Sequence, residues 1–213
     1  MGVGKTLQAI GISYLYKDDW PLMIICPSSL KYTWRDEILR WLPNIQKQDI
    51  QLFKVGKDQF SEVAQVFIMS YDLAQRKSES IAEREFKSVI ADECHYLKNR
   101  DAKRSKQLMP ILQQAKRCIL ISGTPMLSRP VEAFNLLTIL RPDIFGKFNE
   151  FANRYCAPKQ GRFGMDYTGN SCTNELHYML SKNLMIRRLK KDVLKELPAK
   201  RRQKIQVNVE AKD

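Results

Sequence analysis

The chain has 213 residues, of which 44% are hydrophobic and 28% are charged, a composition that excludes an intrinsically disordered protein. It contains no apolar run as long as a membrane span and no charged-then-apolar signal pattern. The five cysteines show no Cys-x-x-Cys spacing. Reduced thiols in a cytosolic or nuclear protein are therefore expected, without a zinc site.

Positive charge is the unusual part of this composition. The chain carries 36 Lys and Arg against 23 Asp and Glu, a net charge of +13. Ten basic and two acidic residues lie between Ser181 and Lys204, so +8 of that charge is concentrated there. Such a segment indicates a polyanionic partner, with nucleic acid favoured over membrane because no amphipathic basic helix with an aromatic face accompanies it. A solvated basic surface is the alternative.

The first six residues match the second half of a phosphate-binding loop, G-x-x-x-x-G-K-[S/T]. In such loops backbone N–H groups and the Lys hold phosphates, while the Ser or Thr hydroxyl ligates Mg²⁺. We therefore predict that Gly2, Gly4, Lys5 and Thr6 bind a nucleotide. The first Gly of the pattern and its preceding strand would fall before Met1. A chance match and an N-myristoylation signal on Gly2 are the alternatives.

Short apolar runs alternate with helical patterns through the first two thirds of the chain. The predicted strands are Leu22–Cys26, Val66–Met69, Ser88–Ala91 and Cys118–Ile121, with a more polar candidate at Ile50–Val55. The predicted helix faces comprise Leu30, Trp34, Ile38 and Trp41 or Leu42, and then Leu108, Ile111 and Leu112. Continuous apolar strands alternating with helices predict an α/β fold, a doubly wound parallel sheet flanked by helices. Ligands bind such sheets at the carboxyl ends of the strands.

Two adjacent carboxylates, Asp92 and Glu93, follow the predicted strand Ser88–Ala91 and precede Cys94 and His95. One carboxylate can hold Mg²⁺ through its water shell, and its neighbour can orient or deprotonate a water for attack on a γ-phosphate. An acidic pair at the surface is the alternative. We expect Cys94 to be a small buried hydrophobe.

A second polar segment, Ser122-Gly123-Thr124-Pro125, follows the predicted strand Cys118–Ile121. Such a sequence can be a simple turn. Together with the two preceding patterns, it indicates a coupling segment whose hydroxyls hydrogen-bond the carboxylate and imidazole cluster.

The pattern becomes helical after Pro130. The predicted helices are Val131–Leu140, Lys147–Tyr155, Thr173–Leu184 and Met185–Leu197. Ala157–Ser171 contains three glycines and little periodicity, which predicts a loop, and Lys204–Val209 alternates like a strand. We therefore expect a helical appendage on the carboxyl side of the sheet.

Taken in order, these segments resemble the first RecA-like lobe of a Snf2-type ATPase in helicase superfamily 2. Gly2-Val3-Gly4-Lys5-Thr6 resembles motif I, Cys26-Pro27-Ser28-Ser29-Leu30 with Trp34 motif Ia, Met69-Ser70-Tyr71-Asp72 motif Ib, Asp92-Glu93-Cys94-His95 motif II and Ser122-Gly123-Thr124-Pro125 motif III. Met185–Val193 and Leu197–Lys200 resemble the segment that leads out of that lobe. Trp20-Pro21-Leu22, Arg154-Tyr155-Cys156 and Asp166–Gly169 resemble the annealing-helicase branch, which remodels replication forks.

The resemblance implies ATP and Mg²⁺ as cofactors and a role for each matching residue. Lys5 would bind the β/γ-phosphates, Thr6 and Asp92 would hold Mg²⁺, Glu93 would activate water, and His95 would couple the site to Ser122 and Thr124. Ser28, Ser29, Ser70 and Tyr71 would follow the DNA backbone, while Arg187 and Arg188 would mix packing with attraction for phosphates. Arg100, Lys103 and Arg104 would form a rim near the DNA or a solvated face.

The resemblance also implies how the chain is organised. Residues 1–141 would form the ATPase lobe, truncated at its N-terminus, residues 142–200 a helical protrusion, and residues 201–213 the start of the connection to a second RecA-like lobe that the chain lacks. We expect a nuclear, DNA-dependent ATPase that acts on double-stranded or branched DNA without reading sequence and without a membrane partner. Alone, the chain should hydrolyse ATP poorly, because an arginine finger from the second lobe is expected to complete the site.

Three other functions remain open at this point. They are a nucleosome-remodelling Snf2 ATPase, a non-catalytic basic nucleic-acid-binding module with a degenerate nucleotide loop, and a small P-loop kinase or GTPase.

Overall fold

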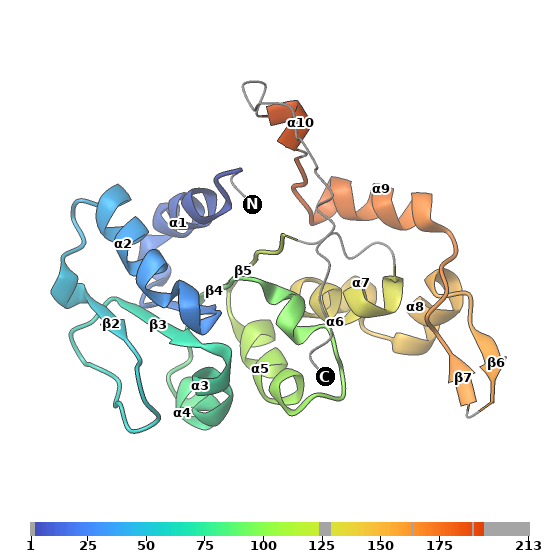
Figure 1. Cartoon of the computed structure of the whole chain (residues 1–213), viewed down its shortest axis with the longest axis horizontal. Coiled ribbons are helices and arrows are strands. Elements are labelled where there is room, and N and C mark those ends of the chain that lie inside the picture. The colour runs from blue at the N-terminus through green and yellow to red at the C-terminus, as the bar shows by residue number, and fades with distance from the viewer. Residues whose placement is uncertain (1–2, 124–128, 163, 189, 194–213) are drawn as a thin grey trace, which may run out of the picture.

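The computed structural model describes residues 3–123, 129–162, 164–188 and 190–193 (Figure 1). Its centre is a five-stranded parallel sheet in the order β2-β3-β1-β4-β5. The strands are β1 (Leu22–Cys26), β2 (Ile50–Leu52), β3 (Val66–Ser70), β4 (Ser88–Ala91) and β5 (Arg117–Leu120). This arrangement confirms the predicted α/β fold with a parallel sheet.

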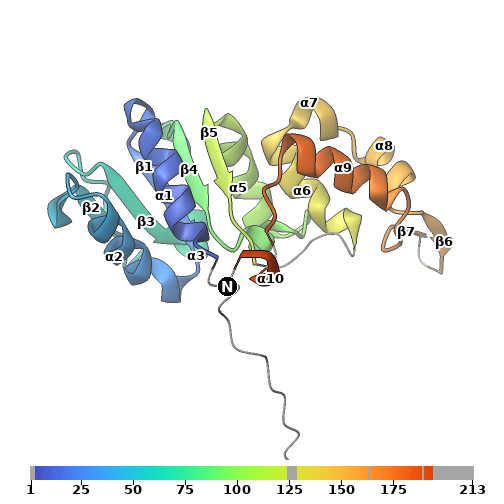
Figure 2. The same ribbon diagram turned by 90° about the horizontal axis from the view of Figure 1, so that it is seen from above.

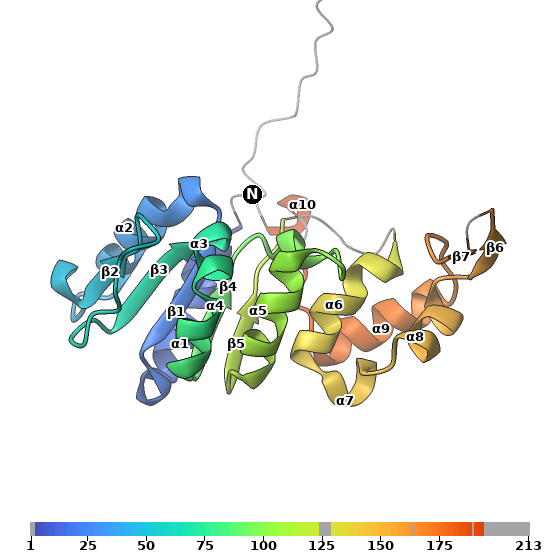
Figure 3. The same ribbon diagram turned by 90° about the horizontal axis from the view of Figure 1, so that it is seen from below.

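Helices cover the two faces of the sheet. α1 (Lys5–Leu15) and α2 (Lys31–Trp41) lie on one face (Figure 2). α3 (Tyr71–Arg76), α4 (Ser78–Glu83) and α5 (Lys103–Gln114) lie on the other (Figure 3). Short 3₁₀ turns connect these elements: η1 (Lys17–Asp19), η2 (Ser28–Leu30), η3 (Lys47–Asp49) and η4 (Cys94–Leu97).

The strands supply both cores because their side chains alternate between the faces. In β1, Met23 and Ile25 pack with α3, α4 and α5, whereas Leu22 and Ile24 pack with α1 and α2. Every residue of β1, β3 and β4 is buried, as expected for inner parallel strands covered by helices. On α2 it is Leu42, just beyond the helix end, and not the exposed Trp41, that continues the buried face.

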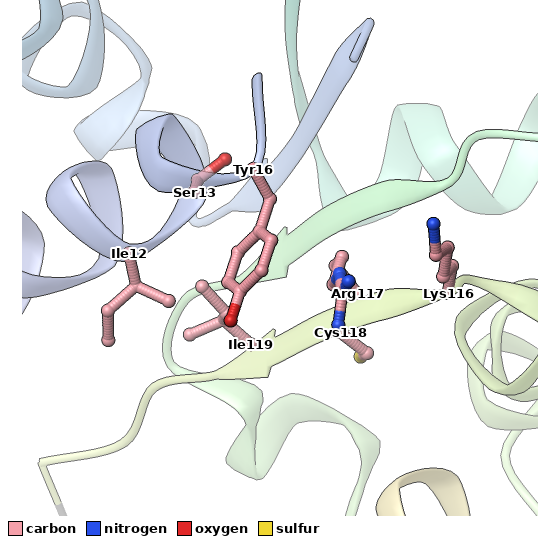
Figure 4. A pocket seen from close by; sticks show the side chains of 7 residues that line it. All are labelled: Ile12, Ser13, Tyr16, Lys116, Arg117, Cys118 and Ile119. Atoms are coloured by element: carbon pink, nitrogen blue, oxygen red, sulfur yellow. The ribbon is translucent and has the colours of Figure 1, made fainter. Parts of the chain in front are cut away.

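β5 differs from these inner strands because all its residues are only partly buried. Among the described residues it pairs with β4 alone, so its other edge is open. A pocket of about 240 Å³ lies along this edge, between the end of α1 and β5 (Figure 4). Ile12, Ser13, Tyr16 and residues 116–119 line it.

A helical part follows the sheet. It consists of α6 (Pro130–Leu140), α7 (Pro142–Phe145), α8 (Phe148–Tyr155), the hairpin β6 (Lys159–Gly161) and β7 (Gly164–Asp166), α9 (Thr173–Asn183) and α10 (Lys190–Val193). Its core is an aromatic cluster that includes Phe134, Phe145, Phe151 and Tyr155. No helix among the described residues is long and apolar enough to cross a membrane.

Two predictions for this part were wrong. The segment Ala157–Ser171, predicted as a loop, contains the hairpin β6–β7. All six of its strand residues are exposed, so no hydrophobic alternation marks the hairpin in the sequence.

The predicted helix Met185–Leu197 does not begin at Met185. The N–H groups of Leu184 and Met185 both donate to the Leu180 carbonyl, which ends α9, and residues 185–188 are irregular. Arg187 and Arg188 are exposed, so these two residues add no packing that would favour a helix. Within this stretch the described helix is Lys190–Val193, and residues 194–197, like the predicted strand Lys204–Val209, lie outside the described residues.

Candidate functional site

The predicted site residues meet at the carboxyl edge of the sheet. In the strand register Cys26 lies opposite Ser70, and Ile25 lies opposite Ala91. The Asp92 N–H then donates to the Ile25 carbonyl at 2.8 Å. The segments that follow β3, β1 and β4 are therefore neighbours in space, as expected at the ligand-binding edge of a parallel sheet.

The phosphate-loop residues that the structure describes lie at the start of α1. Gly4 adopts a left-handed conformation, with φ 71° and ψ 24°, which a residue without a Cβ enters at little cost. α1 begins directly afterwards at Lys5, and Thr6 lies in its first turn. Burial is the main influence on the pKa of Asp92 and raises it, and the positive charge of Lys5 is the weakest of the influences that oppose this rise. Gly2 lies outside the described residues.

Asp92 is held in place by hydrogen bonds to both of its carboxylate oxygens. Oδ2 accepts the indole N–H of Trp34 at 2.9 Å, and Oδ1 accepts the Glu93 N–H at 2.8 Å. The residue is 7% exposed, and burial raises its pKa. The hydrogen bonds from Trp34 and Glu93 oppose that rise because they stabilise the ionised form.

Glu93 occupies a strained backbone position, with φ 49° and ψ 48°. Such left-handed conformations are uncommon for residues other than Gly and concentrate at functional sites. Its Oε2 lies 3.1 Å from Nδ1 of His95 and 3.5 Å from the N–H of Gly123. Nδ1 is buried and lacks a well-aligned hydrogen bond, so the contact with Glu93 is close but not linear.

The coupling segment approaches the same carboxylate from β5. The Cys94 N–H donates to the Ile121 carbonyl at 2.8 Å, which joins the end of β5 to the Asp92–His95 segment. Ser122 and Gly123 follow β5, and the Gly123 N–H lies 3.5 Å from Oε2 of Glu93. Thr124 lies outside the described residues, so its predicted role stays a prediction. Cys94 is 1% exposed and lies in the hydrophobic core, as predicted.

The residues predicted to follow DNA fall into two groups. Ser28 and Ser29, in η2, are exposed, and so are Arg187 and Arg188. Ser70 and Tyr71 are buried, at 6% and 2% exposure. These two side chains face the protein interior, and their predicted contact with the DNA backbone stays a prediction.

Ser70 and Tyr71 are buried, and the hydroxyl of each forms a hydrogen bond inside the protein. The Ser70 Oγ accepts the Leu73 N–H at 3.3 Å and caps α3. The Tyr71 hydroxyl donates to the Asp92 carbonyl at 2.8 Å. Within Met69–Asp72, the exposed residue is Asp72.

Of the residues predicted as a rim or solvated face, Arg104 also has structural contacts. Its guanidinium lies over the rings of Tyr71 and Tyr96, at 5.7 and 5.3 Å, and bonds to Asp72 at 2.6 Å. Arg100 lies over the ring of Phe148. Lys103 is exposed at the start of α5.

The contact between Trp34 and Asp92 was not predicted from the sequence. Trp34 was assigned to a buried helix face, and it is 1% exposed. The available signal was the indole itself, because a buried Trp N–H usually has a hydrogen-bond partner.

The residues present fit a magnesium–nucleotide complex. No cluster of three or more His, Cys, Asp or Glu side chains that could hold a metal occurs among the described residues. Mg²⁺ in nucleotide sites uses one or two protein oxygens, water and the phosphates. Thr6 and Asp92 match that small donor set. Each Asp92 oxygen accepts one of the two hydrogen bonds described and retains lone pairs for a hydrated ion.

A parallel α/β sheet with a Gly-Lys-Thr helix start and two carboxylates at its carboxyl edge defines the class of phosphate-loop nucleotide-binding proteins. The family follows from comparison with known proteins. The model of the SNF2-related domain matches residues 1–213, and the chain belongs to this family.

The curated relatives include a protein named as a DNA annealing helicase and another named as SWI/SNF-related. The chain is 44% identical, over 97% of its length, to the Xenopus tropicalis SWI/SNF-related matrix-associated actin-dependent regulator of chromatin subfamily A-like protein 1. It is 46% identical, over 96% of its length, to the Bos taurus DNA annealing helicase and endonuclease ZRANB3. It spans only 22% and 20% of these relatives.

A solved structure of the Sulfolobus solfataricus SWI2/SNF2 ATPase core in complex with dsDNA shares the fold. The TM-score is 0.73 at 24% sequence identity, covering 93% of this chain and 41% of that chain. This likeness confirms the predicted RecA-like fold.

Proposed function

We propose that this chain is the first ATPase lobe of a nuclear, DNA-dependent translocase that hydrolyses ATP to remodel double-stranded or branched DNA. The observation that carries the proposal is the placement of Asp92 and Glu93 at the carboxyl edge of the sheet, with Asp92 fixed by two hydrogen bonds and with a Gly-Lys-Thr helix start in the same part of the chain. Family membership supports the coarse activity, and the annealing helicase among the relatives favours this branch.

Each residue has a defined part in this proposal. Lys5 and the N–H groups around Gly4 bind phosphate oxygens, and Thr6 and Asp92 hold Mg²⁺, which neutralises charge on those oxygens. Glu93 accepts a proton from the attacking water. His95 lies 3.1 Å from Glu93 and keeps that carboxylate oriented.

The proposal extends to the organisation of the protein. Residues 1–141 form the ATPase lobe, residues 142–200 a helical protrusion, and residues 201–213 the beginning of a connection to a second lobe. The relatives are about five times longer than this chain, which leaves room in them for a second lobe. In it, exposed Ser28, Ser29, Arg187 and Arg188 contact phosphate and sugar, and so position DNA without reading bases.

A nucleosome-remodelling ATPase is the second candidate, because the name of one relative includes "regulator of chromatin". The two candidates differ in their preferred substrate. ATP turnover by a protein that contains this lobe should rise more with forked DNA than with nucleosomes if the annealing-helicase proposal is correct. A stronger response to nucleosomes would favour the second candidate.

The nucleotide site itself is tested by Lys5→Ala. Binding of a fluorescent ATP analogue with Mg²⁺ should weaken about tenfold or more, because a charge-assisted contact to phosphate is lost. Lys57→Ala removes the same charge from an exposed loop and should leave binding unchanged. Equal affinity of Lys5→Ala and the unaltered chain would refute the proposed site.

A further inference from the structure

Asp92 is bonded by two aromatic side chains that come from other parts of the chain. The Trp34 indole donates to its carboxylate at 2.9 Å, and the Tyr71 hydroxyl donates to its backbone carbonyl at 2.8 Å. Trp34 and Tyr71 are 1% and 2% exposed. Water therefore cannot readily replace either donor, and Asp92 is held from two sides by groups with little freedom to move.

Each of the two donors also lies within a few residues of an exposed side chain at the carboxyl edge of the sheet. Trp34 is in the first turn of α2, which directly follows η2 with its exposed Ser28 and Ser29. Tyr71 is the first residue of α3, beside exposed Asp72. Both segments thus have a surface end, and a buried aromatic side chain that reaches Asp92.

A stack of rings strengthens the second of these connections. The Tyr71 and Tyr96 rings are parallel within 7°, with centroids 5.1 Å apart, and Tyr96 also contacts the His95 ring at 5.1 Å. Arg104 covers both tyrosines and bonds to Asp72 at 2.6 Å. The Asp72 segment is therefore linked by contacts both to the Asp92 backbone and to the imidazole beside Glu93.

We infer that Trp34 and Tyr71 are positioning residues, which connect the outer ends of η2 and α3 to the Asp92 carboxylate. DNA bound against the exposed end of η2 changes the placement of Asp92, which these two donors hold, and so the affinity of the site for Mg²⁺. This inference rests on the proposed function, since it takes Asp92 as the magnesium carboxylate. It adds a route by which DNA acts on hydrolysis, through two hydrogen bonds of aromatic donors.

The three tryptophans of the chain provide a direct test. In a ¹⁵N-labelled sample each indole N–H gives its own NMR signal, which Trp→Phe variants assign. Trp20 donates to the Ser13 carbonyl and Trp41 to Glu37, so these two indoles are internal controls. A short DNA duplex, added without nucleotide, should shift the Trp34 signal but not the two control signals.

The outcomes of this experiment are distinct. Shifts of the Ser28 or Ser29 amides without a shift of the Trp34 indole would overturn the inference. A duplex that shifts none of these signals would overturn both the inference and the proposed DNA surface.

Two conservative variants test the connection to the metal. Tyr71→Phe removes the hydroxyl donor and keeps the ring, whereas Trp34→Phe removes the indole donor and puts a smaller aromatic ring in its place. Each should raise the Mg²⁺ concentration for half-maximal nucleotide binding severalfold. Nucleotide affinity measured without Mg²⁺ should not change, a separation that general damage to the fold would not produce. The matched controls are Trp20→Phe and Tyr178→Phe. Tyr178 is 63% exposed.

Unaltered Mg²⁺ dependence in both variants would overturn the inference while leaving the nucleotide site intact. The Lys5→Ala result distinguishes a failure of this inference from a failure of the proposed function, because it reports on the nucleotide site whether or not the aromatic donors position Asp92.

Discussion

The sheet and the helical part of this molecule use polar side chains in different ways. In the sheet part, Asp92 is bonded by Trp34 and Tyr71, which lie 58 and 21 residues away in sequence. In the helical part, the main polar cluster joins Arg154 and Tyr155 to Glu175 at the surface, over an aromatic core. The strand ends bring distant segments together in a buried edge, and the proposed chemistry is found there.

α6 joins the two parts and contributes to both cores. Leu136 and Ile139 pack in the core beneath the sheet, whereas Phe134 and Leu137 pack in the aromatic cluster. Between them, buried Asn135 donates to the carbonyls of residues 97 and 98, which close the η4 turn after His95. The helical part is therefore attached close to the proposed catalytic segment.

The largest expected effect is at Glu93. In a protein that carries both lobes, Glu93→Gln should reduce ATP hydrolysis about 10²- to 10⁴-fold, the usual contribution of a positioned general base. Nucleotide binding should persist, because Lys5 and Asp92 remain. Glu150→Gln makes the same change in the exposed Lys147 pair of the helical part and should leave hydrolysis unchanged. Equal rates of ATP hydrolysis by Glu93→Gln and Glu150→Gln would mean that the carboxylate at the sheet edge matters no more for hydrolysis than one in the helical part.

Much of the sheet part could be predicted from the sequence because its signals are local. The continuous apolar runs mark β1, β3 and β4 within a residue of their ends, and a carboxylate directly after such a run must lie at the ligand-binding edge. The hairpin β6–β7 could not be predicted, since its exposed strands carry no hydrophobic pattern.

The inward turn of Tyr71 and the Trp34 contact could not be predicted for another reason. Both depend on how α2 and α3 pack across the sheet edge, and periodicity within one helix does not specify its long-range partners. The motif resemblance predicted DNA contacts for Ser70 and Tyr71, but it did not predict that the Ser70 hydroxyl caps α3 or that the Tyr71 hydroxyl bonds to the Asp92 carbonyl. Local sequence identified the site, and tertiary packing determined which side chains face it.

An intermediate effect is expected at the junction of the two parts. Asn135→Ala removes the amide donor to the carbonyls of buried Leu97 and exposed Lys98, and it should lower the free energy of unfolding by about 1 kcal/mol, because the Leu97 carbonyl keeps the hydrogen bond from the Ser105 hydroxyl. Urea unfolding followed by circular dichroism measures this. Asn183→Ala removes an exposed amide that bonds to the Met179 carbonyl, and should cost much less. Similar losses for the two variants would show that the junction adds little to stability.

The smallest effect is expected at Glu175, in the helical part. The hydrogen bond from Arg154, followed by that from Tyr155, lowers the pKa of this carboxyl. A lowered folded pKa means that the ionised pair stabilises the fold above the unfolded pKa of about 4.3, and that this stabilisation is lost as pH falls through the folded value. Glu175→Gln should therefore reduce the melting temperature slightly at pH 7, by less than Asn135→Ala.

The pH dependence distinguishes this charge effect from a loss of packing. Gln has nearly the shape of a protonated Glu, so the melting temperatures of Glu175→Gln and the unaltered chain should converge in acid, below the folded pKa of Glu175. About 1 M salt, where the Debye length is about 3 Å, should also reduce the difference at pH 7, because the pair is partly exposed. A difference that persists in acid and in salt would mean that Glu175 stabilises the helical part through packing and not through its charge.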